Sequence, residues 1–147
     1  MKLSDILHAT DVLVLDGVDS KRQLLQELAD HAAKTAGVDA RTLFDVVLER
    51  ENLGTTAMGK GIAVPHARVP SLKHTQALFA KVKGGVDFEA ADEKKVDLVF
   101  LLLSPEDSGA DHLNALAEIS RVMKSETECA KLRKTVNSAE IYKILAD

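Results

Sequence analysis

The stretch Val96-Asp97-Leu98-Val99-Phe100-Leu101-Leu102-Leu103 decides the fold class of this chain. Its last six residues are all apolar, so an extended segment here would have no polar face. A continuous apolar run of this kind is typical of a strand inside a sheet that carries helices on both sides. The pair Ser104-Pro105 then ends the run. We therefore predict a central strand over 96–103 and an α/β fold.

Shorter patterns on either side of this segment predict the remaining strands and turns. Strands are expected at 12–15, at 62–64 before Pro65, and at 75–83 before Gly84-Gly85. The stretch from Gly54 to Gly61 has three glycines and is predicted to form turns. Strands that alternate with helices in this way form a sheet covered on both faces.

Capping residues mark where the helices begin and end. Asp19 or Ser20 is expected to begin a helix that stops at Gly37, and Asp39 is expected to begin the next one. In that second helix Arg50 follows Val47 by three residues and so continues its inward-facing stripe. A helix over about 111–124 follows the central strand. Its predicted inner face consists of Leu113, Leu116, Ala117, Ile119, Ser120 and Met123. Two short helices finish the chain, the last of them capped by Asn137.

Length and composition exclude several classes of protein. The 147 residues predict one domain, 1–147, large enough to bury a core without disulfides or structural metals. Net charge is −4, and the aromatic residues are four Phe and one Tyr, which argues against a nucleic-acid partner. Cys129 is the only cysteine, so there is no disulfide framework; we expect it to be a buried apolar residue. With no signal peptide and no long apolar run, we expect no membrane insertion and a cytoplasmic protein.

Two of the five histidines have positions that suggest chemistry. His66 follows the strand at 62–64, and His112 opens the helix after the central strand. Ligands of α/β sheets bind just beyond the carboxyl ends of the strands, and helix N-termini attract anions. Neighbouring strands would bring both imidazoles into one crevice. His8, His31 and His74 lie at polar positions and are interpreted as surface residues.

Other chemistries find less support in the sequence. Gly54 to Lys60 lacks the spacing of a nucleotide-binding loop, and Gly59-Lys60-Gly61 lacks the third glycine of a dinucleotide fingerprint. Ser71 and Ser104 lack the context of a catalytic serine. A zinc hydrolase on His66 and His112 would require a third ligand such as Asp111, which the spacing does not demand.

Three segments together resemble a known family. They are Leu53-Gly54-Thr55-Thr56-Ala57-Met58-Gly59-Lys60-Gly61-Ile62-Ala63-Val64-Pro65-His66, Glu49-Arg50-Glu51 and Asp111-His112-Leu113. The chain resembles, over essentially its whole length, the enzyme IIA (EIIA) domain of the mannitol/fructose-type bacterial phosphotransferase system. The resemblance implies an α/β fold with a mixed, mainly parallel five-stranded sheet flanked by helices on both faces.

The resemblance also implies roles for individual residues. His66 would accept a phosphoryl group from a histidine-phosphorylated carrier, HPr or its homologue NPr, and would be a phosphohistidine intermediate. Arg50 and His112 match the two residues that flank the phosphoryl group. Thr55 and Thr56 would add hydroxyl donors. Since donor and product are both phosphohistidines, the transfer requires no metal or cofactor.

The opening of the chain suggests a branch of the family. Leu3-Ser4-Asp5-Ile6-Leu7 and Ser20-Lys21-Arg22 look like the nitrogen-regulatory branch, in which the phosphorylation state controls targets such as a kinase or an ion transporter. The alternative is a relay of phosphate to an EIIB protein for the uptake of a fructose- or mannitol-type sugar. The chain departs from the branch pattern at Ala57-Met58 and at Ala67-Arg68, and neither change removes a reacting group.

Overall fold

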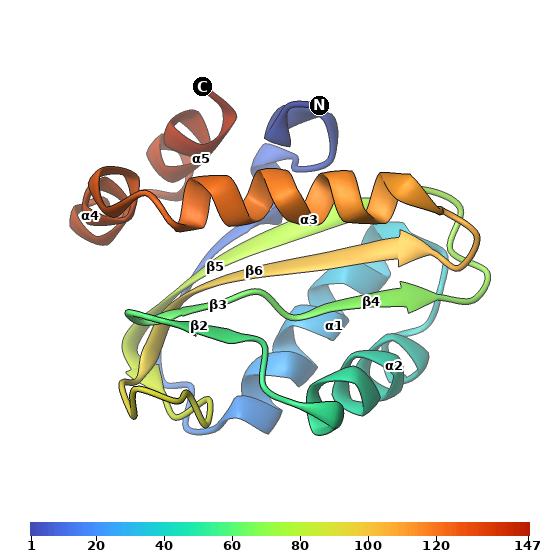
Figure 1. Cartoon of the computed structure of the whole chain (residues 1–147), viewed down its shortest axis with the longest axis horizontal. Coiled ribbons are helices and arrows are strands. Elements are labelled where there is room, and N and C mark those ends of the chain that lie inside the picture. Colours follow the sequence, from blue (N-terminus) through green and yellow to red (C-terminus); the bar gives the residue numbers. More distant parts are fainter.

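The computed structural model describes all 147 residues and contains one open mixed sheet (Figure 1). The strands are β1 (Val12–Leu15), β2 (Ala57–Gly59), β3 (Ile62–Ala63), β4 (His66–Val69), β5 (Gln76–Val86) and β6 (Val96–Pro105). Their order is β1-β5-β6-β3-β2, and β4 pairs with β6 beyond the end of β3. Since β3 and β4 follow one another along the same side of β6, the six strands occupy five positions. Three ladders are parallel and two are antiparallel.

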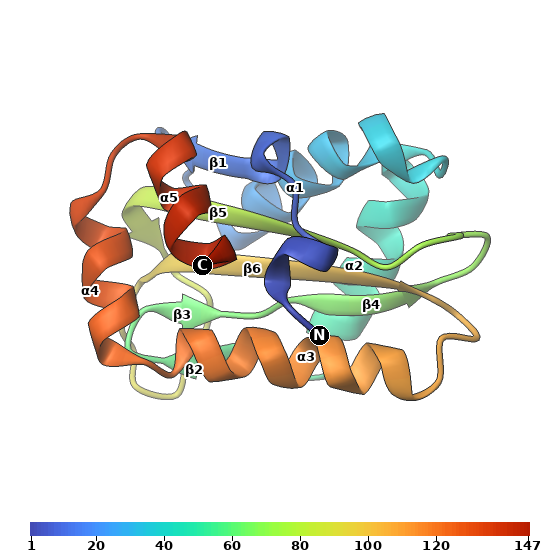
Figure 2. The ribbon, with the colours of Figure 1, turned by 90° about the horizontal axis from the view of Figure 1, so that it is seen from above.

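Helices cover both faces of this sheet, which confirms the predicted α/β class (Figures 1 and 2). The helices are α1 (Lys21–Ala36), α2 (Ala40–Leu53), α3 (Ala110–Met123), α4 (Glu126–Lys134) and α5 (Ser138–Ala146). α1 and α2 lie on one face, and α3, α4 and α5 lie on the other with both chain termini. Two single-turn 3₁₀ helices, Leu3–Asp5 and Ala9–Asp11, precede β1. None of the helices combines the length and the apolar character needed to cross a membrane.

β6 is the central strand that the sequence predicted. Val99, Leu101 and Leu103 pack into the core beneath α1 and α2. The alternating residues Leu98, Phe100 and Leu102 pack into the second core beneath α3 and α5. All six side chains are fully or almost fully buried, because successive residues of a strand point to opposite faces and both faces are covered.

The predicted caps are confirmed at three helices. Ser20 and Asp39 accept hydrogen bonds from backbone amides in the first turns of α1 and α2, and Asn137 does so in α5. α1 ends at Gly37, whose φ of 69° is the left-handed conformation that glycine adopts without strain.

The structure corrects or completes three predictions about strands and turns. The turn-rich stretch contains β2, which forms a hairpin with β3 through the left-handed residues Lys60 and Gly61. His66 comes shortly after the end of β3, as predicted, but it is also the first residue of a further strand, β4, which the sequence did not predict. Gly84-Gly85 does not close β5, because the strand continues past a register shift to pair Val86 with Val96.

The predicted inner face of α3 was also partly wrong. Leu113 is 62% exposed, whereas His112, Ala115, Ile119 and Met123 are buried against the sheet. The helix is therefore rotated by about one residue from the orientation that its most apolar stripe predicts. This rotation turns His112, rather than Leu113, toward β6.

Candidate functional site

An open cavity of about 510 Å³ lies at the β4 edge of the sheet. Its polar lining residues come from three elements: Glu49 and Arg50 from the last turns of α2, His66 and Arg68 from β4, and His112 from the first turn of α3, with Glu106 beside them. Both predicted histidines and Arg50 therefore line one cavity. Figure 1 shows why: β4 passes between the C-terminal end of α2 and the N-terminal end of α3.

A hydrogen bond to a nearby backbone carbonyl holds His66 in a single tautomer. Its Nδ1 lies 2.9 Å from the carbonyl oxygen of Val64. A carbonyl oxygen only accepts hydrogen bonds, so Nδ1 must carry the proton and donate it. The lone pair of the neutral ring is then on Nε2. The ring is half-buried and lines the cavity, so Nε2 is the nitrogen available as a nucleophile.

His112 lies directly beside this ring but in a drier environment. The two ring centroids are 5.7 Å apart, and the planes are tilted by 48°. His112 is 5% exposed, and its Nδ1 lies 2.7 Å from the hydroxyl oxygen of Ser104. Burial, followed by the positive charge of Arg68 and by the repulsion between two protonated imidazoles, lowers the pKa of His112 below its ordinary 6.5. His112 is therefore a neutral imidazole at pH 7.

Two guanidinium groups line the cavity, that of Arg50 from α2 and that of Arg68 from β4. Arg50 Nη1 donates to the carbonyl oxygen of Gly54 at 3.0 Å, which holds the side chain against the end of α2. Arg68, two residues after His66 on the same face of β4, donates to the Ser108 hydroxyl and to the Gly109 carbonyl. Arg68 thereby ties β4 to the loop that leads into α3.

Thr55 and Thr56, the two predicted hydroxyl donors, do not line this cavity. Thr55 Oγ1 donates to the carbonyl oxygen of Phe88 at 2.8 Å. Thr56 is buried and donates to Glu51 Oε1 at 2.5 Å. Since each hydroxyl carries a single proton, both donors are already used within the fold.

Gly61, the last glycine before His66, has a structural reason to be glycine. A Cβ on Gly61 would lie 2.7 Å from Arg133 Nη2, and the φ of Gly61 is 81°. Gly61 therefore serves the β2–β3 turn and not the cavity around His66. No group of three or more His, Cys, Asp or Glu side chains is arranged to hold a metal ion.

Comparison with known proteins identifies the family. The model of the family "Phosphoenolpyruvate-dependent sugar phosphotransferase system, EIIA 2" matches residues 5–147. The chain belongs to this family. Its EIIA fold agrees with the mixed sheet and flanking helices described above.

The chain is similar both to nitrogen regulatory proteins and to a sugar-specific EIIA component. The nitrogen regulatory protein of Bradyrhizobium diazoefficiens is 46% identical over 146 residues, which cover 99% of this chain and 95% of that protein. The crystal structure of the nitrogen regulatory protein IIA-Ntr from Neisseria meningitidis superposes with a TM-score of 0.91 at 30% identity, covering 97% and 98% of the two chains. A fructose-specific EIIA component from Haloferax volcanii is 34% identical over 129 residues, or 87% of this chain and 84% of that one.

Ser104 is the site residue that sequence reasoning missed, because it was considered only as a nucleophile. The sequence of β6 contains a pattern that indicates a role for Ser104. Residues 98, 100, 102 and 104 of β6 all point toward α3, and Ser104 is the only polar one among them. A fully buried hydroxyl at that position requires a hydrogen-bond partner on α3, and His112 supplies it.

A buried carboxylate fixes the end of α2, where Arg50 lies. Glu51 is 3% exposed and accepts hydrogen bonds from the backbone amide and hydroxyl of Thr56. Lys21 Nζ, from α1, lies 2.8 Å from Glu51 Oε2, the oxygen that also accepts the hydrogen bond from the Thr56 amide. Burial alone would raise the pKa of Glu51, but the hydrogen bonds from Lys21 and Thr56 outweigh it and lower the pKa below the ordinary 4.5.

We expect Glu51→Leu to lower the free energy of unfolding by about 3 kcal/mol at pH 7, because Lys21 and Thr56 lose their buried partner. Glu49→Leu, on the exposed side of the same turn, should change it by less than about 0.5 kcal/mol. Urea unfolding measures both values. Because the folded pKa of Glu51 is depressed, its contribution is complete above pH 4.5 and is lost as the pH falls through the folded pKa. Equal losses in the two variants at pH 7, or a difference that persists in acid, would contradict this role.

Proposed function

We propose that this chain is a cytoplasmic phosphocarrier, one EIIA domain over 1–147, that accepts a phosphoryl group on His66 Nε2. The observation that carries the proposal is the fixed tautomer of His66. Its Nδ1 donates to the Val64 carbonyl, which leaves the Nε2 lone pair directed to a cavity shared with Arg50 and His112. Membership of the EIIA family supports the same reaction. By the family resemblance, the donor is an HPr-like phosphohistidine protein such as NPr.

The transfer is a displacement between two imidazoles. The Nε2 lone pair of His66 forms the new nitrogen–phosphorus bond while the bond in the donor phosphohistidine breaks. The electron pair of the broken bond stays on the donor imidazole. The phosphorylated His66 ring keeps its Nδ1 proton, and the Val64 carbonyl stabilises the positive charge that the ring acquires. The reaction requires positioning and charge stabilisation rather than a cofactor.

Arg50 and His112 would stabilise the phosphoryl oxygens from two sides. The guanidinium of Arg50 is permanently charged and can donate two parallel hydrogen bonds. His112 contributes as a neutral donor when the Ser104 hydroxyl donates to its Nδ1, since the ring proton is then on Nε2. Arg68 adds positive charge at the cavity while it holds the loop before α3. The proposal makes no use of Thr55 and Thr56.

We expect Ser104→Ala to slow phosphorylation of His66 about fivefold, as the loss of one hydrogen bond of ~1 kcal/mol predicts. Ser104→Thr, which keeps the hydroxyl, should restore most of the rate. Nitrogen-15 spectra of the ring would report the proton directly: the His112 Nε2–H tautomer should dominate in the parent and lose population in Ser104→Ala. An unchanged tautomer in the alanine variant would rule out this positioning role.

The proposal is tested by incubating the protein with phosphoenolpyruvate, the enzyme that charges the carrier, and the HPr-like carrier. We expect one phosphoryl group per chain, stable in base and labile in acid, as phosphoramidates are. Omission of the carrier should prevent labelling. Label that appears without the carrier, or that survives acid, would overturn the proposal.

Phosphorylation of His66 can serve one of two functions, and similarity to known proteins supports each of them. Similarity to nitrogen regulatory proteins favours docking of the unmodified form on regulatory targets such as a kinase or an ion transporter, with phosphorylation altering that docking by adding negative charge. Similarity to a fructose-specific EIIA component supports the alternative, transfer onward to an EIIB protein. A capture experiment with His66→Ala and His66→Asp tests the first of these functions, and chase of the labelled protein with purified EIIB tests the second.

A further inference from the structure

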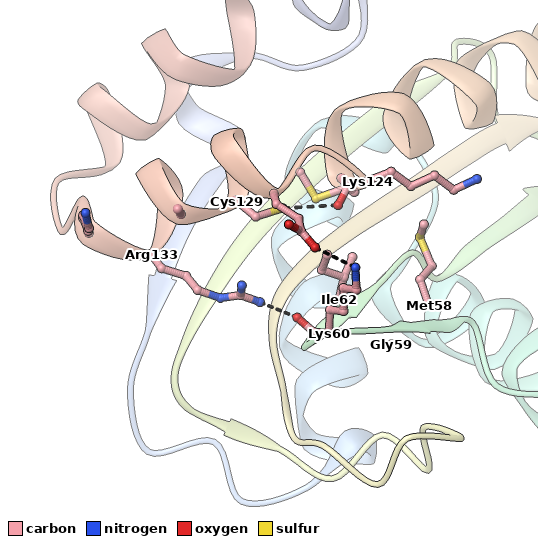
Figure 3. Close-up of a pocket in the computed structure, with 11 residues that line it drawn as sticks. Met58, Gly59, Lys60, Ile62, Lys124, Cys129 and Arg133 are labelled. Atoms are coloured by element: carbon pink, nitrogen blue, oxygen red, sulfur yellow. Dashed lines mark hydrogen bonds and ion pairs between the residues drawn. The ribbon is translucent and has the colours of Figure 1, made fainter.

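A second cavity, of about 640 Å³, lies at the opposite end of α3 from His112 (Figure 3). The β2–β3 hairpin forms one side, and the end of α3 together with α4 forms the other. The floor is apolar: Met58 and Ile62 come from the hairpin, and Met123, Cys129 and Ala130 come from the helices. A volume of this size and an apolar floor are typical of small-molecule sites in proteins.

The charged residues around this floor are mostly cationic. Lys60, Lys124, Arg133 and Lys134 line the cavity, against the single carboxylate of Glu126. On a chain with a net charge of −4, this concentration of positive charge is local to the cavity. An apolar interior with a cationic rim is complementary to an amphiphilic anion.

Two of the four cations are available for such a ligand. Lys60 Nζ is paired with Glu126 Oε1 at 2.7 Å, and Arg133 Nη2 is paired with Asp97 Oδ1 at 2.9 Å. Neither Lys124 nor Lys134 forms an ion pair. Both are exposed and line the cavity, but α4 separates them, because Lys124 precedes this helix and Lys134 ends it. A head group on Lys134 would leave an apolar chain free to run along α4 to the floor.

We propose that this cavity binds a small amphiphilic anion, with an apolar body on Met58, Ile62 and Met123 and a carboxylate or phosphate head on Lys134. Nothing in the phosphoryl transfer at His66 requires this site. The hairpin position Ala57-Met58, where the chain departs from the pattern of its branch, contributes Met58 to the apolar floor.

The methionines of the chain make the proposal directly testable. There are three: Met58 and Met123 line the cavity, and Met1 lies in a different part of the surface. Protein labelled with carbon-13 on the methionine methyl groups therefore gives two reporters and one internal control. The probes are decanoate and decyl phosphate below their micelle concentrations, with decanol as the uncharged analogue and acetate as the head group alone.

We expect the Met58 and Met123 signals to shift saturably with decanoate or decyl phosphate, while Met1 stays in place. The tighter of the two anions identifies the head group. Decanol should bind at least tenfold more weakly and acetate should shift neither signal. Equal shifts at Met1, equal affinity for decanol, or no saturable shift with either anion would overturn the proposal.

Variants separate a specific site from general adsorption. Lys134→Gln should weaken binding about fivefold, whereas Lys131→Gln, on the same helix but outside the cavity, should leave it unchanged. Ala130→Trp should fill the cavity and abolish the shifts. Equal affinities of the two lysine variants would contradict the head-group contacts. His66→Gln should titrate like the parent, so this experiment and the phosphorylation experiment fail independently.

Discussion

Replacement of His66 by glutamine will abolish phosphorylation from the HPr-like carrier, with a loss of more than about 10⁴-fold in the extent or rate of labelling. Glutamine keeps a polar side chain of similar reach but has no nucleophilic nitrogen. The half-buried position of His66 at the start of β4 makes the variant compatible with the fold. Quantification of labelled protein after reaction with phosphoenolpyruvate and the carrier measures the loss.

The other histidines supply the controls for this experiment. His74→Gln, at an exposed position outside the cavity, should be labelled at the parental rate. The His112→Gln variant should still be phosphorylated on His66, but more slowly. Its acceptor is intact, whereas the neighbouring imidazole that donates to the phosphoryl group is replaced. Label retained by His66→Gln, or label lost only in His112→Gln, would move the acceptor to the other imidazole of the pair.

Replacement of Arg50 by glutamine will slow phosphoryl transfer to His66 by about 10²–10³-fold. The charge that spreads over the phosphoryl oxygens in the transition state loses a permanent cation in a cavity that also contains Glu49 and Glu106. Arg50→Lys should recover only part of the rate, because a lysine restores the charge but not the paired, planar donors. Single-turnover labelling at saturating carrier measures the rate.

The matched control for Arg50 is Arg41, which lies at the other end of α2. Arg41 is exposed and paired with Asp45, so Arg41→Gln removes the same charge without affecting the cavity. It should leave the transfer rate unchanged. Thermal unfolding should show that Arg50→Gln keeps the parental fold, although it loses the hydrogen bond to Gly54. A rate loss of equal size in both variants would mean that Arg50 acts through overall charge and not at the phosphoryl group.

Much of the fold followed from local patterns. The continuous apolar run of β6, the caps Ser20, Asp39 and Asn137, and the stop at Gly37 were all predictable because each depends on neighbours within a few residues. The strands that the sequence did not predict are those whose local pattern is weak. β2 and β4 are three and four residues long, and pairing with β3 and β6, rather than any periodicity of their own, makes them strands.

The predictions for the candidate site can be divided in the same way, into those that local pattern supports and those that depend on packing. His66, His112 and Arg50 were identifiable from motif and position, and the structure brings all three to one cavity. The hydroxyls of Thr55 and Thr56 were assigned to that site from the motif alone. Their actual partners, the Phe88 carbonyl and Glu51, depend on how the Gly-rich stretch packs on α2 and on the loop after β5.

The sequence by itself determined the α/β class, the order of helices and the residue types that carry chemistry, because these depend on composition and short-range pattern. Only the tertiary structure decided how α3 is rotated. The apolar pattern favoured an inward Leu113, yet packing on β6 turns His112 inward to the buried hydroxyl of Ser104 and leaves Leu113 exposed. A hydrogen bond between a strand and a helix depends on register and rotation, which are set by contacts across the whole sheet and not by any local stretch.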